Sequence, residues 1–267
     1  MAMFEVTILA ILQGVAEFLP ISSSGHLVIA QNLLGVNEPG MRLDMFLHLG
    51  TLIAIFAYYW KTVWSLLSGL SGKESWIYAA KIVVSAVPAI IVYACFHSQI
   101  KELFESTTAV GALLMFTGVV LVSTRFIPSG AKDIGFLRAL AMGAAQAVAI
   151  LPGVSRSGMT LAAARAGKVA PEKAAEFSFL MSAPLIAGGA LLETLKDTPT
   201  EDMQIGWGLT LYGAVIAAVV GYFSLALLVK TLKGRHFWLF GVYCLAAGLL
   251  AVGWRHVSAV LAPGLAI

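Results

Sequence analysis

The residues that could do chemistry lie in two short polar segments of a chain that is otherwise strongly apolar. The first segment contains Gln13, Glu17 and His26, together with three consecutive serines. Glu17 follows Gln13 by four residues, so the two side chains project from one face of a short helix. A carboxylate at membrane depth marks a functional site by default, and the alternative is a buried Glu held by a structural hydrogen bond.

The serines Ser22, Ser23 and Ser24 follow Pro20 and would open a second short helix. At that position hydroxyls cap the helix, and its first backbone N–H groups point toward any bound anion. Serines in membrane helices also serve simply to permit close packing. His26, on the same helix, has the chemistry of a general acid or base, a nucleophile or a metal ligand. Alternatively, it is a core histidine with satisfied hydrogen bonds.

The second segment is centred on Arg156, a permanent cation with no acidic neighbour in the sequence. Its charge requires an anionic partner, which is either Glu17 or a bound phosphate that the guanidinium grips with two hydrogen bonds. The helix that begins here adds a second positive dipole end of roughly half a charge. The further candidates for substrate contacts in the two segments are Gln13, Ser22, Ser24, Gly153, Ser155, Ser157 and Thr160.

Two helix N-termini, one arginine and a cluster of hydroxyls predict an anion site that faces a glutamate and a histidine. A transporter for a carboxylate substrate could use similar parts. Glu17 and His26 favour phosphoryl chemistry, in which an activated nucleophile attacks phosphorus while positive charge stabilises the phosphoryl oxygens. A diphosphate carries more charge than one Arg neutralises, so we expect a divalent cation, Mg²⁺ or Ca²⁺, with Glu17 as its metal ligand.

Composition places these segments in a membrane protein. Of the 267 residues, 59% are hydrophobic and 12% are charged, against roughly 25% charged in soluble domains. The mean hydropathy is +0.89. The 17 Lys and Arg residues form no basic stripe interleaved with aromatics, which argues against nucleic acid as a partner. Cys95 and Cys244 lie in apolar segments, so they build neither a disulfide framework nor a zinc site.

The elements that must position the two segments are predicted to be helices of an all-α integral membrane protein. Six apolar stretches have the roughly 17 to 25 residues that cross a bilayer as a transmembrane helix. They are 43–60, 78–96, 107–125, 173–192, 207–229 and 237–254. The candidate segments lie at the breaks of two pairs of shorter helices, 4–19 with 22–35 and 136–150 with 154–167. Short pairs broken at proline are typical of re-entrant helical hairpins.

The two hairpins are related by a constant offset of 133 residues, which aligns Gln13 with Gln146 and also matches two serines and a glycine. Three spans lie between the hairpins, so the second enters from the opposite face. We therefore predict a single polytopic membrane domain, 1–267, built from two inverted-topology repeats of about 1–125 and 134–254. In such folds the broken helix tips meet near the midplane and form the site.

The distribution of basic residues predicts the orientation of the chain. Twelve of the seventeen Lys and Arg residues fall on one predicted face and four on the other. This bias favours the first face as cytoplasmic and places both termini outside. The first basic residue is Arg42, so no cleaved signal peptide is expected.

The two segments resemble the bacterial undecaprenyl-diphosphate phosphatases of the bacitracin-resistance type. Gln13 to Glu17 matches the family's (Glu or Gln)-x-x-x-Glu motif, and Pro152 to Thr160 matches its Pro-Gly-x-Ser-Arg-Ser-x-x-Thr motif. The serine run that ends in Gly-His at position 26 is similar to another family segment, as is the sequence from Glu176 to Leu180. The resemblance covers nearly the whole chain.

The resemblance implies hydrolysis of the terminal phosphate of a polyprenyl (C55) diphosphate, giving the monophosphate lipid carrier of cell-wall synthesis, at a site that opens toward the periplasmic side. It implies that Glu17, His26 and Arg156 are essential, with Ser23 a proposed nucleophile, and spacing does not decide between Ser23 and His26 as the attacking group. Many members have Glu at the position of Gln13, so Glu17 should carry more of the base and metal-ligand duties here.

The resemblance also implies a multi-pass protein of the bacterial cytoplasmic (inner) membrane. The expected partners are the polyprenyl diphosphate substrate and membrane lipid, and a homodimer is left open. The competing function is a transporter or flippase for a phosphorylated polyprenyl lipid or a small anion, because inverted repeats are common in transporters.

Overall fold

The computed structural model describes residues 1–36, 41–69, 72–196, 205–234 and 236–261. Within these ranges the regular structure is helical, with one isolated bridge between Lys132 and Val169. The helices are α1 (Met3–Ala16), α2 (Ser23–Leu34), α3 (Met41–Tyr58), α4 (Trp60–Ser68), α5 (Lys73–Phe104), α6 (Thr107–Ser123), the 3₁₀ turn η1 (Thr124–Phe126), α7 (Phe136–Val148), α8 (Arg156–Ala166), α9 (Pro171–Lys196), α10 (Trp207–Leu232) and α11 (Leu239–Leu261). The all-α prediction is confirmed.

Several of these helices are long and apolar enough to cross a bilayer. In the described residues α5, α6, α9 and α10 meet that test, and α3 with α4 makes a fifth candidate if the bent pair counts as one span. The described apolar part of α11, Leu239–Gly253, is shorter. The chain is therefore a multi-pass membrane protein, and the count of six spans stays a prediction.

Two boundaries differ from the sequence expectation. The stretch 43–60 was expected to be one helix, but the chain bends by 78° after Tyr58 and continues as α4. Large apolar side chains of α4, including Trp60, Trp64 and Leu67, are exposed. Trp is enriched at membrane interfaces. A helix there is not recognised from hydropathy alone, which is why α4 was not predicted. The span expected at 78–96 is also longer, because α5 continues to Phe104 past a non-helical residue at Phe96.

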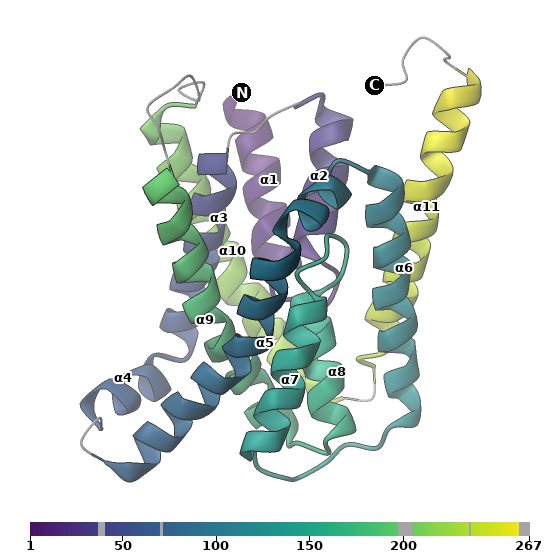
Figure 1. The fold of residues 1–267 in the computed structure, drawn as a ribbon. Helices are drawn as coiled ribbons and strands as arrows, with labels where there is room; N and C mark the ends of the chain where they lie inside the picture. Colours follow the sequence, from purple (N-terminus) through teal and green to yellow (C-terminus); the bar gives the residue numbers. More distant parts are fainter. Residues whose placement is uncertain (37–40, 70–71, 197–204, 235, 262–267) are drawn as a thin grey trace.

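The two pairs of short helices enter the fold from opposite ends. The outer ends of α1 and α2 lie at the end of the molecule where the chain begins, and those of α7 and α8 lie at the other end (Figure 1). Their broken tips are in contact near the middle. A Cβ added at Gly25 would lie 3.1 Å from the Cα of Gly153, and one added at Gly158 would lie 3.4 Å from Pro20. Glycine at these positions therefore lets the tips approach.

The long helices surround the tips. α1 packs against α10 and α7 packs against α5, while α3 pairs with α10 and α6 pairs with α11. The contact between α6 and α11 is made through glycines: a Cβ on Gly118 would lie 2.8 Å from the carbonyl oxygen of Gly241, and one on Gly111 would lie 3.0 Å from that of Gly248. Small residues that let helix backbones approach are the usual contact between membrane helices.

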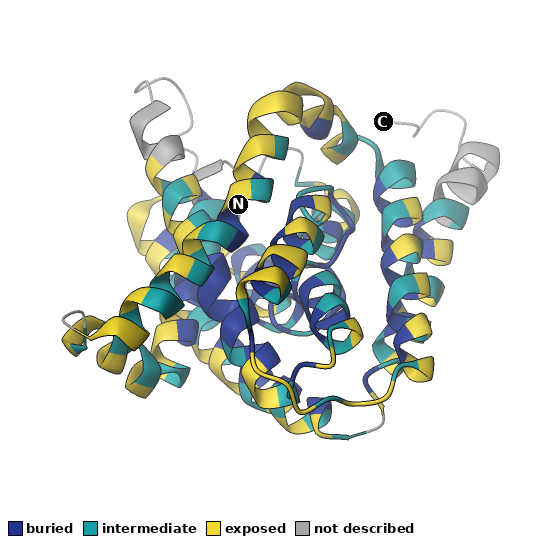
Figure 2. Ribbon diagram, turned by 60° about the horizontal axis from the view of Figure 1, so that its bottom comes forward, coloured by how far each residue is buried: buried dark blue, intermediate teal, exposed yellow. Residues whose placement is uncertain are grey.

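Burial follows the same arrangement. Buried residues gather around the central hairpins, and the outer faces of the long helices are exposed (Figure 2). On α5, for example, Val83, Ile90 and Ile91 are more than half exposed. Apolar surface on this scale is a liability in water, whereas a bilayer covers it. The polar tips are thus enclosed by apolar helices.

Candidate active site

Glu17 and Arg156 form an ion pair between the two hairpin tips. An Oε1 to Nη2 distance of 2.6 Å joins them, and their side chains are only 8% and 15% exposed. Glu17 directly follows α1, and Arg156 is the first residue of α8. Of the two counter-ions that the sequence left open for Arg156, the carboxylate is thus in place. The tips form one composite site.

Contacts with α9 hold the Arg156 side chain in place. Its Nη1 donates to the carbonyl oxygen of Ser178 at 3.2 Å, and its guanidinium carbon lies 5.4 Å from the ring centroid of Phe179. The hydroxyls of Ser178 and Thr160 lie 2.6 Å apart, which ties α8 to α9 directly behind the arginine. These contacts fix the guanidinium plane, and its other N–H groups remain for a ligand.

Three side chains lie close to Oε2, the second carboxylate oxygen of Glu17. Ser23 Oγ donates to Oε2 at 2.6 Å and Gln13 Nε2 donates to the same atom at 3.2 Å. The Nε2 atom of His48, from α3, lies 3.8 Å from this oxygen. His48 Nδ1 lies 2.8 Å from the carbonyl oxygen of Asp44. A carbonyl can only accept, so Nδ1 carries the hydrogen and Nε2 of the neutral ring keeps a free lone pair.

The two tips cap their second helices in the same way. Ser22 Oγ accepts from the Gly25 N–H at 3.3 Å, and Ser155 Oγ accepts from the Gly158 N–H at 3.1 Å. In each case the capping hydroxyl also lies 3.3 Å from the serine two residues later, which is Ser24 or Ser157. Both helix N-termini are thus preorganised by equivalent serines. The repeat over 1–125 and 134–254 as a whole stays a prediction.

Four of the predicted substrate contacts are engaged within the protein and do not line the cavity described below. They are Gln13, Gly153, Ser157 and Thr160. Gly153 has a φ of +90°, and a Cβ there would lie 2.3 Å from the Val110 carbonyl oxygen. Thr117 on α6 holds this turn, donating to the Gly153 carbonyl oxygen at 3.0 Å and accepting from the Ser155 N–H at 3.1 Å. These residues shape the tip.

His26 points away from the carboxylate. Its Nδ1 lies 2.9 Å from the Ser22 carbonyl oxygen, and its Nε2 lies 2.7 Å from the hydroxyl of Tyr243 on α11. The two rings stack with centroids 5.6 Å apart. Because both ring nitrogens have protein partners and the ring is outside the cavity lining, the geometry supports Ser23 over His26 as the attacking group.

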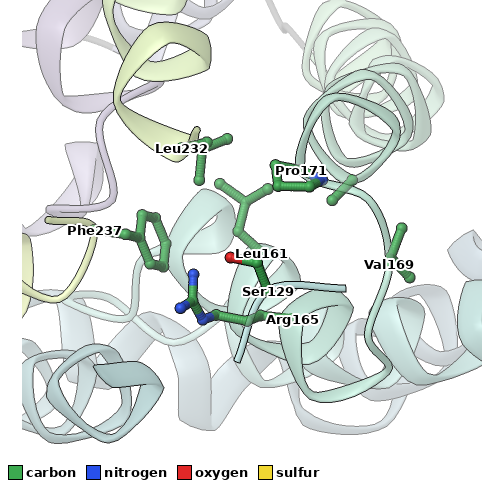
Figure 3. Close-up of a pocket in the computed structure, with 8 residues that line it drawn as sticks. Ser129, Leu161, Arg165, Val169, Pro171, Leu232 and Phe237 are labelled. Atoms are coloured by element: carbon green, nitrogen blue, oxygen red, sulfur yellow. The ribbon is translucent and has the colours of Figure 1, made fainter. Parts of the chain in front are cut away.

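A cavity of about 250 Å³ opens between the tips. Its polar lining includes Glu17, Ser23, His48 and Arg156, with Ser22, Ser24, Ser155, Gln146 and Ser182. Leu185 and Ile186 of α9 and Phe104 at the end of α5 add an apolar side. A second hollow, beside Arg165 and Phe237, is only about 20 Å³ (Figure 3), which is room for about one water molecule. Of these two hollows, the first has room for a ligand.

Three polar cavity residues, His48, Gln146 and Ser182, were missed as functional candidates by reasoning from the sequence. His48 lies within the predicted span 43–60, where a titratable residue in an apolar helix was the available signal. Gln146 had been noted only as the repeat partner of Gln13. It is 3% exposed, and neither its Nε2 nor its Oε1 has a partner in the structure.

The metal ligand predicted from the sequence is Glu17. Among the residues that the structure describes, no three His, Cys, Asp or Glu side chains come together as a metal site. Mg²⁺ is commonly held by one or two carboxylates and the phosphates of a substrate. Glu17 and the neighbouring serine hydroxyls fit that kind of shared site, and they do not form a cage made by the protein alone.

The fold and the site together define a multi-pass helical membrane protein with a cavity of about 250 Å³, lined in part by Glu17, Ser23 and Arg156, between two broken helix pairs. Residues 6–250 match the family model described as bacitracin resistance protein BacA, and the chain belongs to this family. It is 37% identical to an undecaprenyl-diphosphatase of Desulforapulum autotrophicum, over 94% of this chain and 98% of the relative. Identity is 38% to an undecaprenyl-diphosphatase of Pelotomaculum thermopropionicum, over 94% of this chain and 96% of the relative.

Proposed function

We propose that this protein is an undecaprenyl-diphosphatase, a hydrolase that removes the terminal phosphate of a polyprenyl diphosphate in the membrane. Near full-length relatives carry that name, and the family match covers most of the chain. The observation that carries the proposal is the contact series Ser23–Glu17–Arg156 at the cavity, with distances of 2.6 Å at both steps. The names of the relatives favour hydrolysis over the transport alternative.

In the first half of the reaction Ser23 is the nucleophile. Its Oγ attacks the terminal phosphorus, the bond from phosphorus to the bridging oxygen breaks, and the polyprenyl monophosphate leaves. The serine proton passes to Glu17 Oε2, which already accepts it in a hydrogen bond. Arg156 and the N-termini of α2 and α8 stabilise the charge that develops on the phosphoryl oxygens. The leaving phosphate needs no proton, since its second pKa is about 6.

In the second half, water cleaves the phosphoserine. Glu17 now holds the proton of Ser23, so another group must accept the proton of the attacking water. His48 Nε2 faces this point from the cavity wall and is a free acceptor in the neutral ring. The Oγ–P bond then breaks, Glu17 returns its proton to Ser23, and inorganic phosphate is released. Solvent takes the proton from His48.

A divalent cation, Mg²⁺ or Ca²⁺, is part of the proposal. Glu17 would hold it together with phosphate oxygens, and when bound it would neutralise part of the diphosphate charge that Arg156 alone cannot. We also propose that the site opens toward the outside of the cytoplasmic membrane, with both termini outside. The bias of Lys and Arg toward one face supports this orientation.

The test is phosphate release by purified protein from C55 diphosphate, with Mg²⁺ and with chelator. Wild-type protein should release phosphate, and Ser23→Ala should fall by at least about 10³-fold, as expected for loss of a nucleophile. The matched control is Ser98→Ala on α5, an exposed serine outside the cavity lining, which should keep wild-type activity. No release by wild-type protein, or full activity in Ser23→Ala, would overturn the proposal.

A further inference from the structure

We propose that the side-chain amide of Gln146 binds the phosphate that remains on the lipid, and that this residue makes the site selective for a diphosphate. The inference rests on the proposed function and adds a second phosphate subsite to it. The first subsite, at Ser23, Glu17 and Arg156, takes the phosphate that is removed.

The first observation is an unpartnered amide at the cavity wall. Gln146 is 3% exposed, and both its Nε2 and its Oε1 lack a hydrogen-bond partner in the structure. The residue lies near the end of α7 and lines the same cavity as Ser155 and Arg156. Buried amides are expected to be paired, so an unpaired one in a ligand-sized cavity points to a partner supplied by the ligand.

The second observation is the comparison with Gln13, which occupies the equivalent position at the first tip. Gln13 Nε2 donates to the carboxylate of Glu17, four residues later, at 3.2 Å. The residue four positions after Gln146 is Ile150, which offers no acceptor. The second tip therefore presents the same amide without the anionic oxygen that it binds at the first. A phosphate oxygen has the charge and the lone pairs to take that place.

The third observation is the composition of the cavity wall beyond Gln146. Leu185 and Ile186 share the lining with it, as do Ala149 and Ile150. A diphosphate with its terminal phosphate at Ser23 and Arg156 must place its other phosphate one bridging oxygen away, followed by an apolar chain. A polar group flanked by apolar side chains matches that order. The lining thus suits a phosphate attached to a lipid.

The experiment measures inhibition of phosphate release by each product separately. Polyprenyl monophosphate carries the retained phosphate, and inorganic phosphate is the one that was removed. In Gln146→Leu we expect the inhibition constant of polyprenyl monophosphate to rise about tenfold, the loss of one hydrogen bond to a charged group. The inhibition constant of inorganic phosphate should stay within about twofold of its wild-type value. The KM for the diphosphate should rise in parallel with the inhibition constant of polyprenyl monophosphate.

A structural role is separated by stability and by a matched control. Replacing an unpaired buried amide by an apolar group of similar size should leave the thermal unfolding temperature equal or higher. Gln99→Leu makes the same change at an exposed glutamine of α5 outside the cavity lining, and both inhibition constants should be unchanged. Gln146→Glu, which adds a negative charge, should weaken the monophosphate further than Gln146→Leu does.

Three results would overturn the inference. Both inhibition constants could stay at their wild-type values in Gln146→Leu, or both could rise in the same proportion. The constant of inorganic phosphate alone could rise, which would assign Gln146 to the departing phosphate. Each of these leaves wild-type turnover and the Ser23→Ala loss intact, whereas failure of the proposed function is an inactive wild-type protein.

Discussion

The Glu17–Arg156 pair should couple the two hairpin tips energetically. Glu17→Gln and Arg156→Met each remove one charge while keeping similar side-chain size. Each leaves the partner charge in a site where the side chains are 8% and 15% exposed. Removing one partner of a buried pair costs about 3 to 5 kcal/mol, and we expect about 3 kcal/mol because water reaches part of Arg156.

The double variant Glu17→Gln/Arg156→Met leaves no uncompensated charge. It should therefore be less destabilised than the sum of the two single variants. The difference is the coupling energy, and we expect about 2 kcal/mol, the value of a hydrogen bond between charged groups. No other ion pair joins the two tips in the ranges that the structure describes, so this cycle isolates their electrostatic contact.

The assay is thermal unfolding of the four proteins in one detergent at one pH. For a chain of this size 1 kcal/mol corresponds to about 2 to 4 °C, so each single variant should unfold roughly 6 to 12 °C below wild type. The matched control is the pair Glu172 and Lys233, which are 55% and 60% exposed at a 3.2 Å separation. Its coupling should lie below about 1 kcal/mol, as for surface pairs.

The reasoning is refuted if the Glu17 and Arg156 effects add within about 0.5 kcal/mol, the limit for independent sites. A coupling no larger than that of Glu172 with Lys233 would have the same meaning. Either result would show that packing of the tips, rather than the charge pair, holds the composite site together.

Four further outcomes follow from individual contacts. Thr117→Val should destabilise the protein by about 2 kcal/mol or more on thermal unfolding, because the Gly153 carbonyl and the Ser155 N–H both lose their buried partner; an unchanged unfolding temperature would contradict this. Gly118→Leu should cost about 1 to 3 kcal/mol by overpacking α6 on α11, whereas Gly189→Leu, with open space around it, should cost little; equal losses would argue against close packing there. His48→Gln should slow turnover by about 10²-fold and let a phosphorylated Ser23 accumulate, detectable by mass spectrometry of the quenched enzyme; rapid turnover without it would exclude His48 as the second acceptor. Gln13→Glu places a second carboxylate beside Glu17, so phosphate release should half-saturate at a lower Mg²⁺ concentration; an unchanged Mg²⁺ titration would argue against a metal held by Glu17.

Much of the site could be predicted because charge is scarce in the chain. A charged residue in an apolar segment is costly enough to stand out, and Glu17 and Arg156 are the two such residues at the broken helix tips. The breaks themselves were readable, since proline and glycine interrupt otherwise helical patterns at 19–21 and 151–153. The structure places the two charges 2.6 Å apart, as the composite site requires.

The parts that could not be predicted depend on long helices that pack against the tips. α3 supplies His48 to Glu17, while His26, the histidine that spacing suggested, turns to Tyr243 on α11. Hydropathy does not reveal how a helix is rotated about its axis. It therefore does not predict which side chains of a transmembrane helix reach the site. The bend that creates α4 was missed for a related reason, because hydropathy gives the apolar content of a stretch and not the direction in which the helix runs.

The sequence by itself determined that this is a helical membrane protein, where its two pairs of short helices break, and which two charged residues lie at those breaks. These properties follow from local composition and spacing. Only the tertiary structure decided which partners complete the site: the His48 imidazole, the Ser178 carbonyl and Phe179 ring around Arg156, and the unpaired amide of Gln146. Those contacts join residues far apart in the chain, and the packing of α3, α7 and α9 around the tips sets their distances.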